Sequence, residues 1–179
     1  MEFVILGLLL LRARTMYEIK HVFEATLALF YSASFGSIST AIGKLLEKGW
    51  IAVQEQVDNG RNKKIYTITP AGTAAFQEWL NSHIPSEKVK EPALTRMFFM
   101  GFLDPAQRIA VLEAHVATLA GLYATLDLLE LQAESLEVPA AQQDLATFQK
   151  LTLQYGKAYY AFSLAWYKRL LSTLKEQAQ

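Results

Sequence analysis

Cysteine is absent from the 179 residues of this chain, which excludes disulfides, thiolate metal sites and cysteine nucleophiles. Histidine is scarce, and His21, His83 and His115 lie far apart without metal-ligand spacing. The sequence contains no Ser-His-Asp motif and no glycine-rich phosphate loop. We therefore expect a protein that is not an enzyme, with no catalytic residues, no metal and no cofactor.

An excess of either charge is also missing, because 17 Lys and Arg balance 17 Asp and Glu. A nucleic-acid partner would have to meet a local basic patch rather than a uniformly basic protein. The apolar run at residues 3–11 follows Glu2 rather than basic residues and is too short to span a bilayer. We expect a buried first helix in a cytoplasmic protein that has no membrane partner.

Residues 36–70 are the most informative segment of the chain. Apolar residues at helical spacing predict a short helix over about 37–48, which Gly49 is suited to end. Two strands should follow, over 50–54 and 64–69, with a polar turn between them. This order is typical of a winged helix-turn-helix, in which the helix enters a DNA groove and the hairpin forms a wing.

The flanking segments fit the same domain. Residues 2–11 should form a central helix, and Thr15 with Glu18 forms a capping-box pattern that opens a second helix. The stretch 25–35 is less regular. Thr69 and Pro70 then begin a fourth helix that runs to about Ser82.

The second half predicts three helices, the last two of them long. Polar residues 84–91 should form a linker, and helices are expected over about 92–103, 105–136 and 139–175. The fold class is thus mainly α. We predict a winged helix-turn-helix domain with a two-stranded wing at 1–83, the linker at 84–91, and a long-helix dimerisation domain at 92–179.

Both long helices carry apolar stripes wider than one antiparallel partner needs. A single pair of such helices would leave much apolar surface in water, and a homodimer would cover it. The alternative is that these helices fold back onto the N-terminal domain.

The DNA-contacting candidates lie on the third helix and on the wing. Ser37, Ser39, Thr40 and Lys44 face away from the apolar side of the helix and suit close approach to bases and phosphates. The alternative is an ordinary solvated face. A cluster of cations beside the predicted turn is free to contact the DNA backbone or minor groove: Arg61, Lys63 and Lys64.

Aromatic residues gather in the second half and have two interpretations. They form the core of a dimer interface, or they line a pocket for a small aromatic effector, and the two are compatible. The residues concerned are Phe98, Phe99, Phe102, Tyr155, Tyr159, Phe162 and Trp166.

With these motifs in view, residues 3–80 resemble the PadR family of bacterial transcriptional regulators. The similarity lies in ILGLLL at 5–10, in FGSISTAIGKLLEKGWI at 35–51 and in KIYTITPAG at 64–72. The second half resembles the longer branch that includes AphA-type virulence activators, which form intertwined dimers. The resemblance implies DNA contacts by the following residues: Ser34, Ser37, Ser39, Thr40, Lys44, Arg61, Lys63 and Lys64.

One departure from the family pattern concerns base recognition. Many relatives have Tyr, often followed by Pro, where this chain has Ser39 and Thr40. The tyrosine contact is therefore not carried over, and the preferred DNA sequence is left open. We expect a homodimeric regulator of inverted-repeat DNA, modulated by a small aromatic effector. The alternative is an effector-binding or protein-interaction module whose winged helix does not contact DNA.

Overall fold

The computed structural model describes residues 1–24, 34–58, 61–84 and 91–177, and for residues 57, 58, 61 and 62 the backbone alone. Contacts divide the chain into two compact units, Met1–Glu87 (unit 1) and Lys88–Gln179 (unit 2). Most of the proposed linker at 84–91, and most of the irregular stretch at 25–35, lie outside the described residues.

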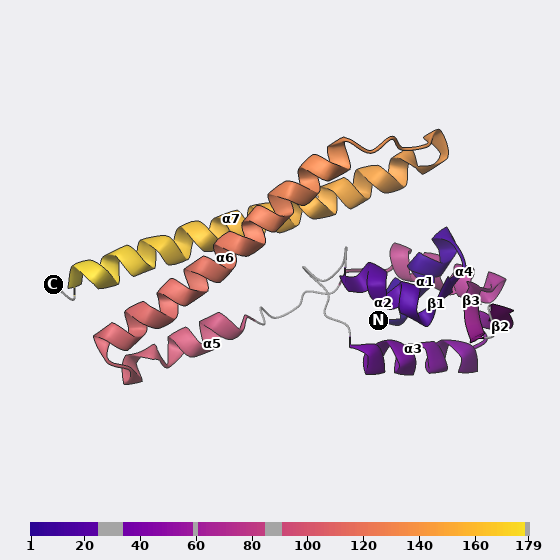
Figure 1. Cartoon of the computed structure of the whole chain (residues 1–179), viewed down its shortest axis with the longest axis horizontal. Helices are drawn as coiled ribbons and strands as arrows, with labels where there is room; N and C mark the ends of the chain where they lie inside the picture. The colour runs from indigo at the N-terminus through magenta and orange to yellow at the C-terminus, as the bar shows by residue number, and fades with distance from the viewer. Residues whose placement is uncertain (25–33, 59–60, 85–90, 178–179) are drawn as a thin grey trace. The chain divides into compact units, whose positions relative to one another are not determined.

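Unit 1 is a small helical domain with a three-stranded antiparallel sheet in the order β1-β3-β2 (Figure 1). The sheet and helices alternate along the chain in the order predicted for a winged helix-turn-helix. The elements are α1 (Glu2–Leu11), β1 (Arg14–Thr15), α2 (Met16–Val22), α3 (Phe35–Glu47), β2 (Ile51–Asp58), β3 (Arg61–Ile68) and α4 (Pro70–Asn81).

The core of unit 1 is built around α1, as its apolar sequence predicted. Ile5 and Leu6 are fully buried, and α4 packs along α1 so closely that a side chain at Gly7 would meet the Phe76 ring at 3.1 Å. Phe3 stacks on Trp79 with ring centroids 5.0 Å apart. The other buried apolar residues are Leu9, Ile19, Phe23, Ile38, Ala41, Ile42, Leu45, Ile51 and Tyr66.

Several predicted helix ends in unit 1 are confirmed by their caps, although α3 begins two residues earlier than expected, after Ser34. The Thr15 hydroxyl accepts from the Glu18 N–H at 3.2 Å, and the Glu18 carboxylate accepts from the Thr15 N–H at 2.7 Å. Gly49 has φ +66°, a left-handed conformation that suits glycine, and it ends α3. At Gly72 a Cβ atom would lie 2.0 Å from the Trp50 carbonyl oxygen, so only glycine lets α4 approach the strand.

The wing differs from the prediction in two ways. Both strands are longer than expected, because cross-strand pairing continues from Ile51 opposite Ile68 to Asp58 opposite Arg61. Most of the predicted polar turn is therefore strand. A third strand, β1, was missed: its two residues carry no alternating pattern, and it exists only because Arg14 and Thr15 pair with β3.

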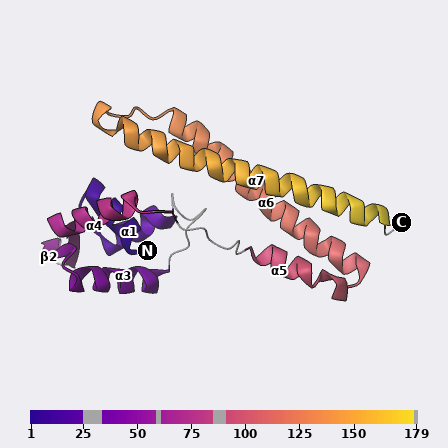
Figure 2. The same ribbon diagram turned by 180° about the vertical axis from the view of Figure 1, so that it is seen from behind.

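Unit 2 consists of a short helical segment and two long helices that lie side by side (Figures 1 and 2). The long helices are antiparallel, because Lys175 near the end of one pairs with Glu113 near the start of the other at 2.6 Å. Lys157 bridges Asp127 and Glu130 at mid-length. The elements are α5 (Pro92–Phe98), η2 (Met100–Phe102), α6 (Pro105–Glu134), η3 (Ala140–Gln142) and α7 (Gln143–Gln177).

The face of α7 that packs on α6 is not the predicted aromatic stripe. Tyr167 is 2% exposed and lies in a core with Leu112 and Leu119, joined by Tyr160, Leu164 and the leucines near the end of α7. Most of the predicted stripe points to solvent instead, because the same helix cannot turn both sides toward α6. These exposed residues are Leu145, Phe148, Tyr155, Tyr159 and Phe162, whereas Trp166 packs on the core.

Candidate nucleic-acid interface

Helix α3 has one buried face and one exposed face, as its sequence predicted. Ile38, Ala41, Ile42 and Leu45 are buried against the core of unit 1. Leu46, which the pattern placed on the same side, is at the edge of that face with 36% exposure. The exposed side carries Ser34, Ser37, Ser39, Thr40 and Lys44.

The hydroxyl groups on α3 are not equivalent. Ser34 and Ser37 form a capping box, in which each side chain accepts a hydrogen bond from the other residue's backbone N–H, at 3.1 and 2.9 Å. Ser39 and Thr40 make no side-chain hydrogen bond within the described part of the chain. Their hydroxyls therefore remain available to an outside partner, while those of Ser34 and Ser37 hold the helix start in place.

Gly43 is a further residue on this face of α3 that lacks a large side chain. A Cβ atom built at Gly43 would meet nothing within 4 Å, so packing inside the chain does not require glycine there. Glycine in a helix interior nevertheless costs roughly 0.5–1 kcal/mol relative to alanine. An outside surface that approaches the α3 backbone closely would explain the residue.

Lysines near the interface divide into engaged and available cations. Lys48 donates to Glu2 at 2.6 Å and lies 4.5 Å from the Trp50 ring centroid, so it ties the end of α3 to α1 and to the residue before β2. Lys44 makes no ion pair within the residues that the structure describes. Lys44 is thus the cation of α3 that is free to meet an anion.

The predicted wing cations do not form one cluster. Lys63 and Lys64 are neighbours in the extended strand β3, so their side chains leave opposite faces of the hairpin. Lys64 lies opposite Glu55 and pairs with it at 3.2 Å, whereas Lys63 lies opposite Gln56. The backbone of Arg61 belongs to β3, and its side chain lies outside the described residues.

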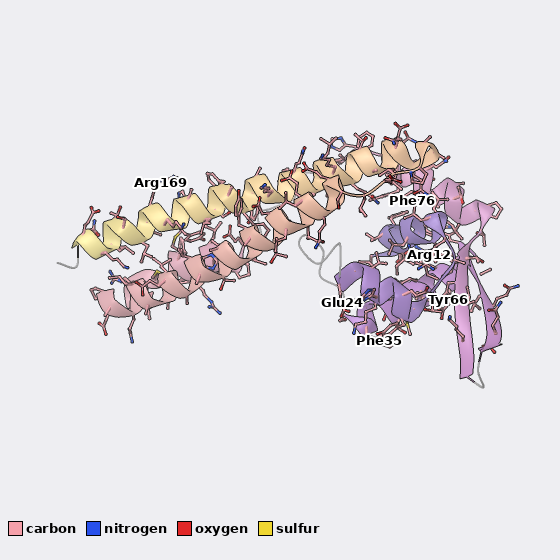
Figure 3. The ribbon with its side chains drawn as sticks, turned by 45° about the horizontal axis from the view of Figure 1, so that its top comes forward. Arg12, Glu24, Phe35, Tyr66, Phe76 and Arg169 are labelled. Atoms are coloured by element: carbon pink, nitrogen blue, oxygen red, sulfur yellow. The ribbon has the colours of Figure 1, made fainter. Side chains whose placement is uncertain are left out.

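Two exposed aromatic residues near the helix pair were missed by the sequence analysis. Tyr17 in the first turn of α2 is 76% exposed, and Phe35, labelled at the start of α3 in Figure 3, is 51% exposed. Sequence patterns assign aromatic residues to a core, so no sequence signal marks these two as surface groups.

The second helix of the pair is held by a strongly acidic carboxyl group. The backbone N–H of Thr15, with smaller contributions from the Thr15 hydroxyl and Arg12, lowers the pKa of Glu18 to about 2. Arg12 also pairs with Glu18 at 2.9 Å. The start of α2 therefore keeps its capping charge under all ordinary conditions.

The predicted aromatic group of unit 2 is largely exposed within one chain. Phe98 and Phe99 pack edge to face with centroids 5.0 Å apart, and Phe98 is 83% exposed. On α7, Tyr159 packs on Tyr160 and Trp166 packs on Tyr167, each edge to face. The described chain thus presents these rings on α5, η2 and α7 rather than enclosing them.

A helical core with an exposed third helix and a β-hairpin wing, followed by a separate long-helix unit, defines a winged-helix regulator. Two family models match consecutive parts of the chain: the transcriptional regulator PadR-like family over residues 5–78 and the virulence activator alpha C-terminal domain over 89–175. The chain belongs to the PadR-like family of transcriptional regulators, in the form that carries a helical C-terminal domain. This is a family of regulators, not enzymes.

A curated relative agrees with this assignment. The negative transcriptional regulator PadR of Bacillus subtilis (strain 168) is 30% identical over 106 residues, which is 58% of either chain. The matched sequence thus spans just over half of that curated relative.

Solved structures share the fold over nearly the whole length. Bacillus subtilis PadR in complex with operator DNA has a TM-score of 0.81 at 22% identity, covering 97% of this chain and 98% of that one. The same protein was solved with p-coumaric acid, with a TM-score of 0.76 at 21% identity and coverage of 97% and 98%. The Vibrio cholerae virulence activator AphA has a TM-score of 0.76 at 22% identity and covers 98% of both chains.

Proposed function

We propose that the chain is a homodimeric regulator that binds inverted-repeat operator DNA through α3 and the wing. The observation that carries this proposal is the exposed face of α3, where Ser39, Thr40 and Lys44 make no side-chain hydrogen bond or ion pair within the described chain and Gly43 has open space beside it. Small residues let the helix backbone approach the DNA closely, and hydroxyls bond to phosphates or to either base type. The operator complex of a structurally similar PadR supports the same use.

Each part of the interface has a distinct role in this proposal. Ser34 and Ser37 fix the start of α3, whose first N–H groups point toward a phosphate. Lys44, Lys63 and Arg61 supply charge to the DNA backbone. Lys64, paired with Glu55, contributes less.

The experiment that tests the proposal is selection of binding sites from random duplex DNA with the purified chain. We expect an inverted repeat whose half-sites lie about one helical turn apart, because a two-fold dimer presents two copies of α3. Selection that enriches no sequence would favour the alternative, a module for effectors or other proteins whose winged helix does not contact DNA.

Dimerisation is supported by the apolar surface of unit 2. By length and composition alone, α6 is apolar enough to cross a membrane, yet only 17% of its most apolar window is buried in the single chain. Leu128 and Leu131 of α6 are each 61% exposed, and Phe162 of α7 is 65% exposed. A second copy would remove such apolar surface from water. We propose that this dimer is cytoplasmic.

A small aromatic effector is the proposed regulatory ligand. The exposed rings Phe98, Phe99 and Phe102 in the α5–η2 segment, and Tyr155, Tyr159 and Phe162 on α7, offer stacking partners where two copies meet, beside the partly buried Trp166. The p-coumaric acid complex of PadR supports a ligand of this class. Calorimetry with p-coumaric acid, followed by operator binding at the same ligand concentration, tests it; heat without a change in operator affinity would contradict regulation.

A further inference from the structure

A groove of about 550 Å³ in unit 2 is left unused by the proposed function. It lies where α5, η2, α6 and α7 meet, and Met100, Val111 and Leu112 provide much of its apolar lining. None of the seven aromatic residues proposed for the effector lines it. Two charged residues of opposite sign also line it: Glu91, the N-cap of α5, and Arg96 in the last turn of that helix.

The Glu91 carboxylate is surrounded by neutral donors. It accepts a hydrogen bond from the Tyr167 hydroxyl at 3.1 Å and a longer one from the Tyr159 hydroxyl at 3.5 Å. Burial, and then the negative charge of Glu91, raise the pKa of Tyr167 to about 12. Within the described residues no cation pairs with Glu91, so a carboxylate beside aromatic rings is left to attract an ammonium group.

Arg96 is the opposite charge at the same groove. Its side chain is exposed and makes no ion pair with any other residue that the structure describes. Arg96 follows Glu91 by five positions, which corresponds to about 7.5 Å along the helix axis at 1.5 Å per residue. The two charges are therefore spaced along α5, with the apolar lining from α6 beside them.

We propose that this groove binds a small linear zwitterion, whose ammonium group meets Glu91 and whose carboxylate meets Arg96. The apolar chain between the two ends lies on Val111 and Leu112. Charge complementarity selects this ligand class, because a simple apolar acid leaves Glu91 unpaired and a simple apolar amine leaves Arg96 unpaired. The site shares no residue with the proposed DNA-contacting face, and it meets the proposed effector residues only through Tyr159, whose hydroxyl donates to Glu91.

The test uses the full-length protein and four probes in ligand-observed NMR titrations. The first probe is 6-aminohexanoate, which carries both charges at opposite ends. Hexanoate and hexylamine each lack one charge, and norleucine is an isomer with both charges at one end. We expect 6-aminohexanoate to bind about fivefold or more tightly than each of the others, the upper range for one partly exposed ion pair.

Two variants assign the charges to their residues. Glu91→Gln should abolish the preference for 6-aminohexanoate over hexanoate, and Arg96→Gln should abolish the preference over hexylamine. Arg169→Gln, a cation on α7 outside the groove (Figure 3), should change neither preference. Equal binding of hexanoate, hexylamine or norleucine to the unmodified protein overturns the proposal, as does binding of none of the four, the result expected if a second copy fills the groove.

Discussion

At the scale of single residues, the exposed face of α3 is defined by the side chains that make no hydrogen bond or ion pair within the described chain. Lys48, the C-cap of α3, is held by Glu2 and Trp50, and Ser34 with Ser37 are used in the cap. Within the described chain, Ser39, Thr40 and Lys44 make no side-chain hydrogen bond or ion pair, and a Cβ at Gly43 would meet nothing within 4 Å. In the proposed complex, binding therefore depends on close approach of the helix to DNA rather than on long side chains that contact the bases.

Gly43 provides the first test of this interpretation. Gly43→Ala should stabilise the fold by roughly 0.4–1 kcal/mol, because alanine restricts the unfolded chain and its Cβ meets nothing within 4 Å. Operator affinity should fall, since the added methyl group holds the helix away from the DNA. Urea unfolding and a fluorescence binding titration measure the two effects. Gly101→Ala, whose Cβ is equally unobstructed, serves as the control that leaves DNA affinity unchanged.

An affinity for operator DNA that does not fall in Gly43→Ala would remove the close-approach argument. The pair of measurements is informative because the expected changes have opposite signs. A variant that simply folded badly would lose stability and affinity together.

At the scale of elements, the pairing of β2 with β3 determines which face of the wing each lysine occupies. Lys63→Ala should weaken binding to all DNA sequences to a similar degree and reduce the slope of log affinity against log salt by about 0.9, the value for one lost phosphate contact. Lys64→Ala is the matched control on the opposite face, where the lysine already pairs with Glu55. An equal loss in the two variants would contradict the assignment of Lys63 to the DNA-facing side.

The capping box of α2 leads to a second prediction at this scale, which concerns the unfolding free energy at low pH. The folded-state pKa of Glu18 is about 2, below its ordinary value of 4.5, so the charged carboxylate stabilises the fold above pH 4.5. That stabilisation is lost as the pH falls from about 4.5 to 2. Glu18→Gln keeps an acceptor for the Thr15 N–H but removes the titration, so its unfolding free energy should fall less steeply over this range.

Urea unfolding of both proteins between pH 2 and pH 6 measures the difference. Glu78→Gln, which changes an exposed carboxylate of α4 for which no pairing is described, controls for the general effect of removing one negative charge. Parallel curves for the native protein and Glu18→Gln would show that the capping carboxylate titrates as in the unfolded chain.

Local signals explain how much of these elements the sequence predicted. Thr15 with Glu18, Gly49, and Thr69 with Pro70 mark helix ends through short-range hydrogen bonds and backbone preference, and all three are confirmed. The strand β1 and the full length of the wing were missed, because they depend on pairing with residues some fifty positions away or on the partner strand. The groove at Glu91 was missed for the same reason.

At the scale of the whole molecule, unit 2 contains more apolar residues than its own core buries. The packing of α6 on α7 uses one side of each helix, around Leu112, Leu119 and Tyr167. The aromatic residues predicted on α7 lie largely outside that core, since Tyr155 and Phe162 are exposed in the single chain. Periodicity identifies an apolar face, but it does not say which of two neighbours covers it.

The proposed dimer is tested at Phe162, which is 65% exposed in the single chain and is not part of its buried core. Phe162→Glu should leave the fold of each chain intact but place an unpaired charge in the interface, which costs about 3–5 kcal/mol and raises the dissociation constant of the dimer at least about 100-fold. Light scattering should then show a monomer at micromolar concentration.

Lys168→Glu places the same carboxylate at an exposed polar position of α7 and should remain a dimer. Operator affinity should also fall in Phe162→Glu. The dimer is lost in this variant, and a single copy of α3 reaches only one half-site. Restoring half-site binding at high protein concentration would show that unit 1 is intact. A Phe162→Glu protein that stayed dimeric would place the interface on another face of unit 2, and the exposed leucines of α6, Leu128 and Leu131, would be the next positions to change.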